Sequence, residues 1–444
     1  MQGQTQAAGQ PQAASTDPVP HWSHTERIAF RSCCVYFSLY VLVTQMLTSL
    51  IFFPWIDWSE LGALPPIRTM VFWVAKHVFH CQSALVVIGS GSGDKTFDWV
   101  EASCLLIIAV IATAIWSAVD RKRHNYVVAH KWFRVFVRFA LGSTMLTYGF
   151  DKAIPLQMPY PYLSRLIEPF GNFSPMGVLW ASIGASPGYE IFGGCAEILG
   201  GLLVLIPRTA MLGALLCLAD MIQVFVLNMT YDVPVKLFSF HLILLALFLL
   251  APETTRLANF FFREQPVGPS KHPALFRARR ANRIALLAQV VFMTYLVAMN
   301  VYGALQGWRQ YGGGAPKSAL YGIWNVEEFT MDGQTHAPLL TDPSRWRRIV
   351  FQFPDRATFQ RMDDSFSYYG ASLNLKEKSL ALTERDGKEP KAHFTFQQPA
   401  QGQLGLDGTM EGHKVHMQLR LVDRDKFLLV SRSFHWIQEY PFNR

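Results

Sequence analysis

Three ionisable side chains interrupt a long apolar stretch of this sequence. Glu197, Asp220 and His241 lie within residues 188–252, which otherwise consist of three apolar spans joined by short turns. A charged group at the depth of a bilayer costs about 2.5 kcal/mol or more, so such residues usually face the interior of a helix bundle and mark a site. The stretch therefore indicates an integral membrane protein, and these three residues are candidates for ligand binding or proton transfer.

The surroundings of Glu197 leave two interpretations open. Two Gly-Gly pairs, at 193–194 and 200–201, flank it with a spacing of seven. They therefore share one helix face and allow a neighbouring helix to approach closely. Glu197 could form an interhelical hydrogen bond or ion pair, with Arg138 as its candidate partner, or it could handle protons or contact a ligand. The same two interpretations apply to Asp220, which lies near the middle of its span.

Two further polar clusters fall at the ends of apolar spans. One contains Tyr148, Asp151 and Lys152. The other is the turn that contains Asn228, Tyr231, Asp232, Pro234 and Lys236. If they converge beneath the proline-rich loop that follows the first cluster, they would form a pocket that combines acid, base and aromatic groups. The alternative is that aromatic and lysine side chains only anchor the ends of the spans at the membrane interface.

Two segments on the predicted outer side resemble sites without matching them. His77, His80 and Cys81 have the spacing of one helical face and the types of metal ligands, but no second ligand cluster follows nearby, so no metal is expected. Residues 84–96 resemble a phosphate-binding loop. Asp94 stands where the Walker pattern requires glycine, and its carboxylate would repel phosphate. A flexible outer loop is therefore expected at 84–96.

Seven predicted membrane spans must position these residues. Their lengths suit a hydrocarbon core of about 30 Å at about 1.5 Å per residue. They lie at about 30–53, 101–119, 133–150, 188–206, 209–228, 236–251 and 284–304. The span at 133–150 is the least apolar because it carries Arg134 and Arg138.

The predicted helical domain spans 26–310, follows an N-terminal segment and contains two further segments besides the spans. Residues 1–25, rich in Gln, Ala and Pro, are expected to be disordered. The loop 151–187 contains many prolines and aromatic residues, which predicts a folded cap over the bundle. Residues 68–88 could form a surface helix, a re-entrant piece or a further span.

Lysine and arginine residues set the predicted orientation. They gather beside the spans at 27–31, 121–134 and 256–283, whereas the alternate loops hold few of them. By the positive-inside rule, the N-terminus is cytoplasmic and the C-terminal domain is extracytoplasmic in a multi-pass protein of the cell (inner or plasma) membrane. The formal net charge of +8 does not indicate nucleic-acid binding, because the basic residues lie beside apolar spans rather than along one face.

The C-terminal part, 315–444, changes to short alternating segments separated by polar turns, the last of them at 426–437. This pattern predicts a small antiparallel all-β domain, either a closed or nearly closed barrel or a β-sandwich. Gly322 and Trp324 resemble the GxW signature of lipocalins. In such a barrel the tryptophan would plug the base and Arg432 would cover it.

Residues 133–252 resemble the DoxX family of small membrane proteins. The resemblance rests on the sequence YGFDK at 148–152, on Glu197 between its two Gly-Gly pairs, and on the basic turn at Arg208. The chain departs from the family at Tyr148, where the family pattern has histidine. The resemblance implies membrane-associated redox work linked to quinones.

Two functions of different classes are consistent with the sequence. In the first, the helical bundle binds a lipophilic small molecule, such as a quinone, at its outer face and exchanges electrons or protons with an outer-face protein partner. The sequence shows no motif for flavin, haem or iron and sulfur, so the protein would not be an oxidoreductase on its own. In the second, the protein is a non-enzymatic, membrane-tethered module whose β-domain binds an apolar ligand or docks a partner.

Overall fold

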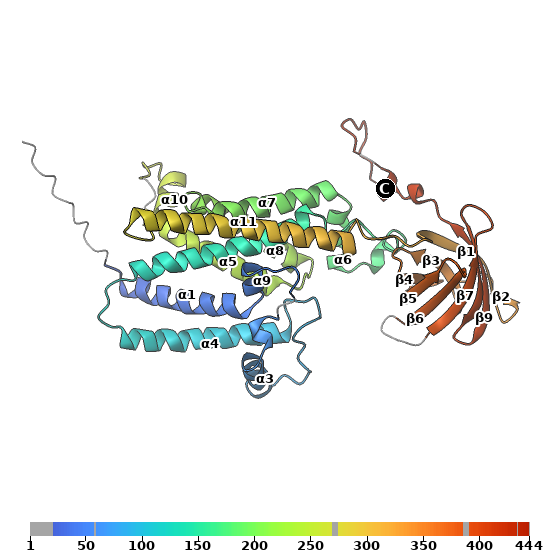
Figure 1. Cartoon of the computed structure of the whole chain (residues 1–444), viewed down its shortest axis with the longest axis horizontal. Helices are drawn as coiled ribbons and strands as arrows, with labels where there is room; N and C mark the ends of the chain where they lie inside the picture. Colours follow the sequence, from blue (N-terminus) through green and yellow to red (C-terminus); the bar gives the residue numbers. More distant parts are fainter. Residues whose placement is uncertain (1–20, 57–58, 269–273, 385–389, 433, 444) are drawn as a thin grey trace, which may run out of the picture.

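The protein consists of a helical bundle and a β-barrel that lie end to end (Figure 1). The computed structural model describes residues 21–56, 59–268, 274–384, 390–432 and 434–443. The prediction of a helical domain followed by a small antiparallel β-domain is confirmed.

Seven long helices of the described chain run nearly along one axis (Figure 1). They are α1 (His24–Val43), α4 (Thr96–Val119), α5 (Val127–Ala153), α7 (Pro187–Leu205), α8 (Ala210–Thr230), α9 (Lys236–Leu250) and α11 (Arg279–Gln310). In the described chain, five helices are long and apolar enough to cross a membrane, namely α4, α7, α8, α11 and α9 continued by η3 (Ala251–Glu253) and α10 (Thr254–Phe261). A helix occupies each of the seven predicted positions, but seven crossings remain a prediction.

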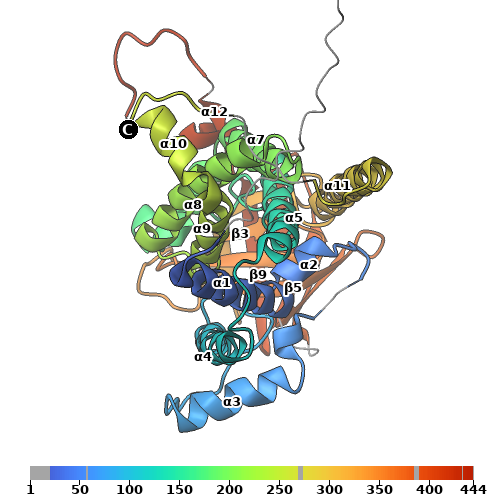
Figure 2. The same cartoon turned by 90° about the vertical axis from the view of Figure 1, so that its left-hand side faces the viewer.

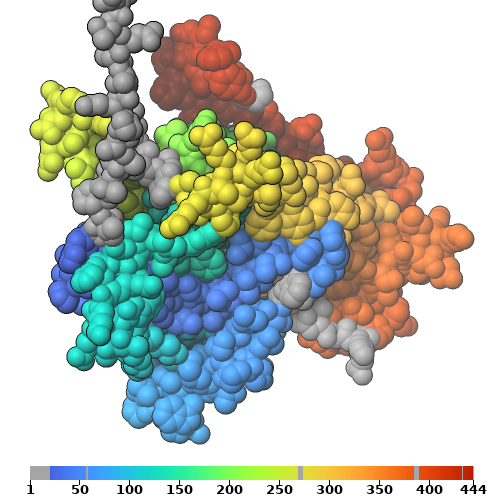
Figure 3. All heavy atoms as spheres, turned by 60° about the vertical axis from the view of Figure 1, so that its left-hand side comes forward, coloured from blue at the N-terminus to red at the C-terminus, as the bar shows by residue number. Residues whose placement is uncertain are grey.

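Helix α11 lies on the outside of this bundle. Figure 3 shows it in yellow along the surface, and only 11% of its most apolar window is buried. Apolar side chains such as Ile284, Leu287 and Val291 are more than half exposed. An apolar exposed helix of this length suits a lipid environment.

The first predicted span, 30–53, has different bounds in the structure. Helix α1 begins at His24, where Ser23 and Glu26 form a reciprocal capping box. It ends at Val43, and the short helix α2 (Met46–Leu50) follows after a break. The predicted disordered segment, 1–25, therefore includes residues that belong to the start of α1. Residues 1–20 lie outside the described residues.

Helix α3 (Ile67–His77) runs across the axis of the bundle (Figures 1 and 2). At about 1.5 Å per residue it is about 17 Å long, too short for a core of about 30 Å, so 68–88 does not form a further span. The helix ends at His77, and His80 has a positive φ of 51°. The prediction that His77, His80 and Cys81 share one helical face is therefore wrong.

Helices α5 and α7 are in backbone contact where their glycines meet. A Cβ built on Gly194 would lie 2.4 Å from the backbone nitrogen of Ala153 and 2.6 Å from the carbonyl oxygen of Gly149. The predicted close approach at the Gly-Gly pairs is present, although a Cβ added to Gly193 would have no atom within 4 Å.

The variant Gly194→Ala should destabilise the bundle by about 1–3 kcal/mol, because two backbones would have to separate. Gly193→Ala is the matched control. No atom lies within 4 Å of its added methyl group, so it should be neutral or stabilising by up to about 1 kcal/mol. Thermal unfolding of the full chain in detergent measures both. Equal stability of the two variants would contradict this packing.

The β-domain is a closed antiparallel barrel. Strand β1 (Gly322–Met331) pairs with β3 (Trp346–Phe351) on one side and β9 (His413–Leu421) on the other, and so closes the sheet. Between them lie β4 (Arg356–Arg361), β5 (Phe366–Asn374), β6 (Ser379–Glu384), β7 (Pro390–Gln397) and β8 (Gln403–Met410), while β2 (Gln334–Thr335) extends only the tip of β1. Closure excludes the predicted alternative of a β-sandwich.

The interior of the barrel is filled by its own side chains. Phe329, Phe359 and Met417 have no exposed surface, and Phe394 is 2% exposed. These side chains belong to one continuous hydrophobic cluster. The observation removes support from the idea that the barrel holds an apolar ligand in its interior, while partner docking stays a prediction.

The last predicted strand, at 426–437, is wrong. Its described residues, 426–432 and 434–437, contain the end of η4 (Arg424–Lys426), the short helix α12 (Leu428–Ser431) and irregular structure. Both edges of β1 are already paired, so the closed sheet leaves no edge for another strand. Arg432 is accordingly exposed and lies 4.0 Å from the centre of the Phe442 ring instead of covering Trp324. Trp324 is buried, and its Nε1 donates to the carbonyl oxygen of Leu320.

The loop 151–187, which joins α5 to α7, contacts the β-barrel. It contains η2 (Phe170–Asn172) and α6 (Pro175–Gly184). Leu163 packs against Ile323 and Val350 of the barrel. The backbone nitrogen of Leu163 also donates to Gln352 Oε1 at 2.9 Å. The predicted cap is thus also the surface on which the barrel rests.

Candidate ligand-binding cavity

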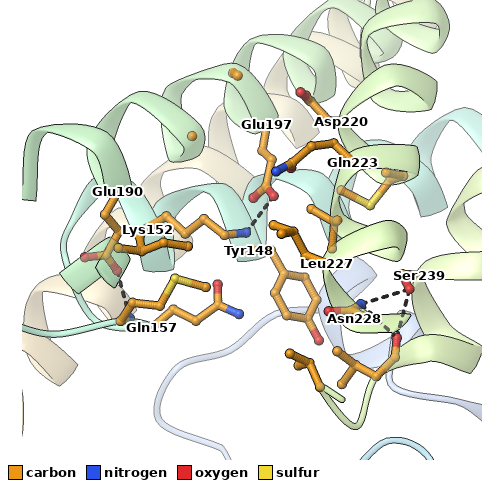
Figure 4. Close-up of a pocket in the computed structure, with 18 of the residues that line it drawn as sticks. Tyr148, Lys152, Gln157, Glu190, Glu197, Asp220, Gln223, Leu227, Asn228 and Ser239 are labelled. Carbon is orange, nitrogen blue, oxygen red and sulfur yellow. Dashed lines mark hydrogen bonds and ion pairs between the residues drawn. The ribbon is translucent and has the colours of Figure 1, made fainter. Parts of the chain in front are cut away.

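A cavity of about 320 Å³ lies between α5, α6, α7, α8 and α9. Most of its wall is apolar and aromatic, including Met145, Met158, Trp180, Phe192 and Leu227. Figure 4 shows the polar side chains that converge on the cavity from these helices. A mostly apolar wall with polar groups that converge is typical of a site for a small lipophilic molecule with a polar head.

An ion pair between α5 and α7 forms the polar part of the wall. Lys152 Nζ lies 2.6 Å from Glu197 Oε1, and the two side chains are only 12% and 4% exposed. The helices reach this geometry because the glycine contact described above brings their backbones together. The interhelical ion pair predicted for Glu197 therefore exists, but its partner is Lys152 and not Arg138.

Several buried oxygen atoms around this ion pair have no hydrogen-bond donor within the described residues. They are Glu197 Oε2, Asp220 Oδ2, Glu190 Oε2 and Gln157 Oε1. All four side chains line the cavity. Buried polar groups are normally hydrogen-bonded, so this concentration favours a polar ligand group at the same place.

Tyr148 lies beside the ion pair in the centre of the wall (Figure 4). Its hydroxyl donates to Gln45 Oε1 at 3.2 Å, and Lys152 Nζ lies 5.9 Å from the centre of its ring. Tyr148 also lines a neighbouring cavity that contains Glu60 and Glu101. The structure therefore brings together five residues singled out in the sequence, namely Tyr148, Lys152, Glu197, Asp220 and Asn228.

Arg138 and His241 have their partners elsewhere. Arg138 Nε donates to the carbonyl oxygen of Val204 at 2.8 Å, and its Nη2 donates to that of Leu205, so it caps the C-terminus of α7. His241 stacks on Tyr40 with ring centres 3.7 Å apart, and the hydroxyl oxygen of Tyr36 lies 2.7 Å from Nε2 of His241. Because its Nδ1 faces the carbonyl oxygen of Leu237, that nitrogen donates and Nε2 accepts. Both residues hold helices together, and neither lines the cavity.

The second predicted cluster lies only partly in this wall. Asn228 lines the cavity, whereas Asp232 and Lys236 do not. Lys236 pairs with the exposed Asp232 at 2.9 Å and lies 3.8 Å from Asp94. Asp151 is next to Lys152 in sequence but is not part of the wall. The predicted convergence of the two clusters is therefore present in part, because Tyr148 and Lys152 of the first cluster and Asn228 of the second line the same cavity.

Asp94 caps the N-terminus of α9, a role that its glycine-rich neighbours in the sequence do not indicate. Its two carboxylate oxygens accept from the backbone nitrogens of Lys236 and Leu237, at 2.8 and 2.9 Å. These nitrogens belong to the first turn of α9, where a negative charge is also favourable. The loop at 84–96 is thus fixed to the bundle at this point.

The variant Asp94→Ala should lower the stability of the bundle by about 1–2 kcal/mol, because two N-terminal amides of α9 lose their acceptor. Asp94→Asn should retain most of the stability, because an amide oxygen is also a good cap. Thermal unfolding of the full chain in detergent measures the stability of both variants. A large loss in Asp94→Asn would show that charge, and not hydrogen bonding, is the main contribution.

Glu190 was missed in the sequence, although a signal for it was present. It is 2% exposed, and its Oε1 accepts from the backbone nitrogen of Met158 at 2.8 Å. Glu190 precedes Glu197 by seven residues, the same spacing that relates the two Gly-Gly pairs. Trp180 and Gln157 had no such signal, since they come from the loop 151–187, whose path depends on tertiary contacts.

The described residues contain no group of three or more His, Cys, Asp or Glu side chains that could hold a metal ion. His77 is exposed, and its Nδ1 lies 2.9 Å from the carbonyl oxygen of Trp73 in its own helix.

Comparison with known proteins gives one similarity. The chain is 29% identical over 144 residues to the uncharacterized protein YwoB of Bacillus subtilis (strain 168), a match that covers 30% of this chain and 82% of that protein. No family model and no solved structure matches the chain. The resemblance to DoxX proteins therefore stays a prediction.

Proposed function

We propose that the cavity between α5 and α9 binds a lipophilic molecule with a polar, quinone-like head, and that the protein takes part in membrane-associated redox chemistry as a DoxX-like component. The observation that carries this proposal is the buried ion pair of Lys152 and Glu197 in a cavity whose wall is mostly apolar. A quinone combines an apolar ring with two carbonyl oxygens, and a quinol presents two hydroxyls.

The polar groups of the wall fit both forms of such a head. Lys152 is a donor for a quinone carbonyl oxygen. The carboxylates of Glu197, Glu190 and Asp220 hold oxygens without donors, and these would accept from the hydroxyls of a quinol. The same carboxylates could pass on the two protons that accompany the two electrons of quinone reduction.

In this proposal, the electrons come from a redox protein at the outer face. The bundle lies in the cell membrane with its N-terminus cytoplasmic, and the β-barrel is extracytoplasmic. The five apolar helices and the position of the basic residues support this arrangement. The barrel, which rests on the loop 151–187 next to α6, would then lie where such a partner could approach.

A cavity-filling variant tests this function. Gly193 lines the cavity and has open space where a side chain would start, so Gly193→Leu should occupy the site. Gly188→Leu is the matched control, because Gly188 lies on the same helix, also has open space and does not line the cavity. Quenching of tryptophan fluorescence by a short-chain quinone measures binding, since Trp180 lies in the wall.

Wild type and Gly188→Leu should bind with a saturable signal, whereas Gly193→Leu should bind at least about tenfold more weakly. Trp180→Phe should lose most of the saturable signal. Saturable binding that is unchanged in Gly193→Leu, or no saturable binding in wild type, would overturn the proposal.

A further inference from the structure

We propose that a second cavity, at the end of the bundle that carries the N-terminus, binds the headgroup of an anionic phospholipid. This cavity has a volume of about 580 Å³ and is lined by α1, α5, α9, α11 and the turn between α7 and α8. It shares no lining residue with the first cavity. The inference therefore does not depend on the redox proposal.

Three cations of α5 face this cavity. Lys131, Arg134 and Arg138 follow one another at spacings of three and four residues, which places them on one helix face. Backbone carbonyl oxygens hold all three in place, and the one that accepts from Arg134 Nη2, at 3.5 Å, belongs to α9. Lys131 Nζ donates to Ala274 and Leu275 at 2.8 Å each, and Arg138 caps α7 as described above. Carbonyl groups orient these cations but do not neutralise them.

Two carboxylates lie near these three cations, and they balance only part of the positive charge. Glu253 Oε1 lies 4.0 Å from Arg134, and its Oε2 is 2.5 Å from Arg256. Glu26 lines the cavity, but its carboxylate accepts from the backbone nitrogen of Ser23 at 2.7 Å. The cavity therefore retains an excess of positive charge, which is complementary to a phosphate group.

The rest of the wall favours a lipid over a free anion. Phe30, Cys33, Val135 and Phe248 provide apolar surface next to the cations, and Trp22 lies at the same end of the bundle. A cavity that joins cations to apolar surface between membrane helices suits a headgroup with its first chain segments.

Gln289 of α11 favours a headgroup that carries a hydroxyl group. Gln289 Oε1 is buried and has no donor within the described residues, although its Nε2 donates to the carbonyl oxygen of Ala285 at 3.2 Å. Gln289 lines the cavity. A headgroup hydroxyl would supply the missing donor, so the cavity fits phosphatidylglycerol better than phosphatidylcholine.

Native mass spectrometry of the full chain in detergent, titrated with phosphatidylglycerol or phosphatidylcholine, tests this inference. Lys131→Gln should weaken phosphatidylglycerol binding about fivefold, and Lys131→Gln combined with Arg134→Gln about 25-fold, since each cation near a lipid surface contributes about a factor of five. The matched control combines Arg121→Gln and Lys122→Gln, which removes two exposed cations at the same end of the bundle that do not line the cavity.

The control should bind phosphatidylglycerol as wild type does, and phosphatidylcholine should bind weakly to all variants. An equal loss in the control would mean that the attraction is a diffuse surface effect, and it would overturn the site. No loss in Lys131→Gln, which is the milder variant and keeps both arginines, would also overturn it. Displacement of the lipid by inorganic phosphate would show that the cavity binds a free anion instead.

Discussion

Replacing Lys152 by methionine should destabilise the bundle by about 3–5 kcal/mol, because Glu197 would be left as a buried charge without its partner. Replacing both residues, as Lys152→Met with Glu197→Leu, should cost much less than the single change. Two buried apolar side chains require no desolvation of charge, so such a double variant can even be neutral or stabilising by about 1–4 kcal/mol.

A double-mutant cycle by thermal unfolding of the full chain measures this coupling. Arg165→Met is the matched control, since Arg165 pairs with Glu168 at 2.5 Å but its side chain is 44% exposed, and the loss should be at most about 1 kcal/mol. Both Lys152 variants should also lose quinone binding. Losses that simply add in the double variant would contradict the description of a coupled buried pair.

The variant Phe359→Ala should destabilise the β-barrel by about 3–5 kcal/mol, while ligand binding by the bundle stays unchanged. Phe359 has no exposed surface, and its ring centre lies 5.1 Å from those of Trp346 and Tyr369. Removal of the ring leaves a void in a closed and filled interior. Quinone titration below the unfolding temperature of the variant measures binding.

Tyr368→Ala serves as the control for Phe359→Ala, because its side chain lies on β5 and is 52% exposed. It should change the stability of the barrel by no more than about 0.5 kcal/mol. Loss of quinone binding in a folded Phe359→Ala protein would place the ligand in the barrel. That result would support the second function, in which the β-domain captures the ligand.

Most helices and strands were predictable from the sequence, but the partner of Glu197 was not. Arg138 and Lys152 lie on one helix, and by residue type alone either of them could form the ion pair with Glu197. They are about 21 Å apart along the helix axis at about 1.5 Å per residue, so only one can be level with Glu197. The structure places Lys152 there and Arg138 at the C-terminus of α7.

The errors at 84–96 and 426–437 have a common cause, which is that local patterns do not report distant contacts. Asp94 was assigned to a flexible loop because its neighbours are glycines and serines, yet it caps a helix that begins at Lys236. Residues 426–437 have the composition of a strand, but the pairing of β1 with β9 uses the last free edge. Neither outcome could be derived before the tertiary arrangement was known.

Electron cryomicroscopy of the full chain in lipid nanodiscs with a short-chain quinone tests the central claim most directly. We expect ligand density between α5, α7 and α8, with a carbonyl oxygen within hydrogen-bond distance of Lys152 Nζ and the ring against Trp180 or Phe192. Density inside the β-barrel, or a cavity whose polar groups contact no ligand at saturating quinone, would contradict it.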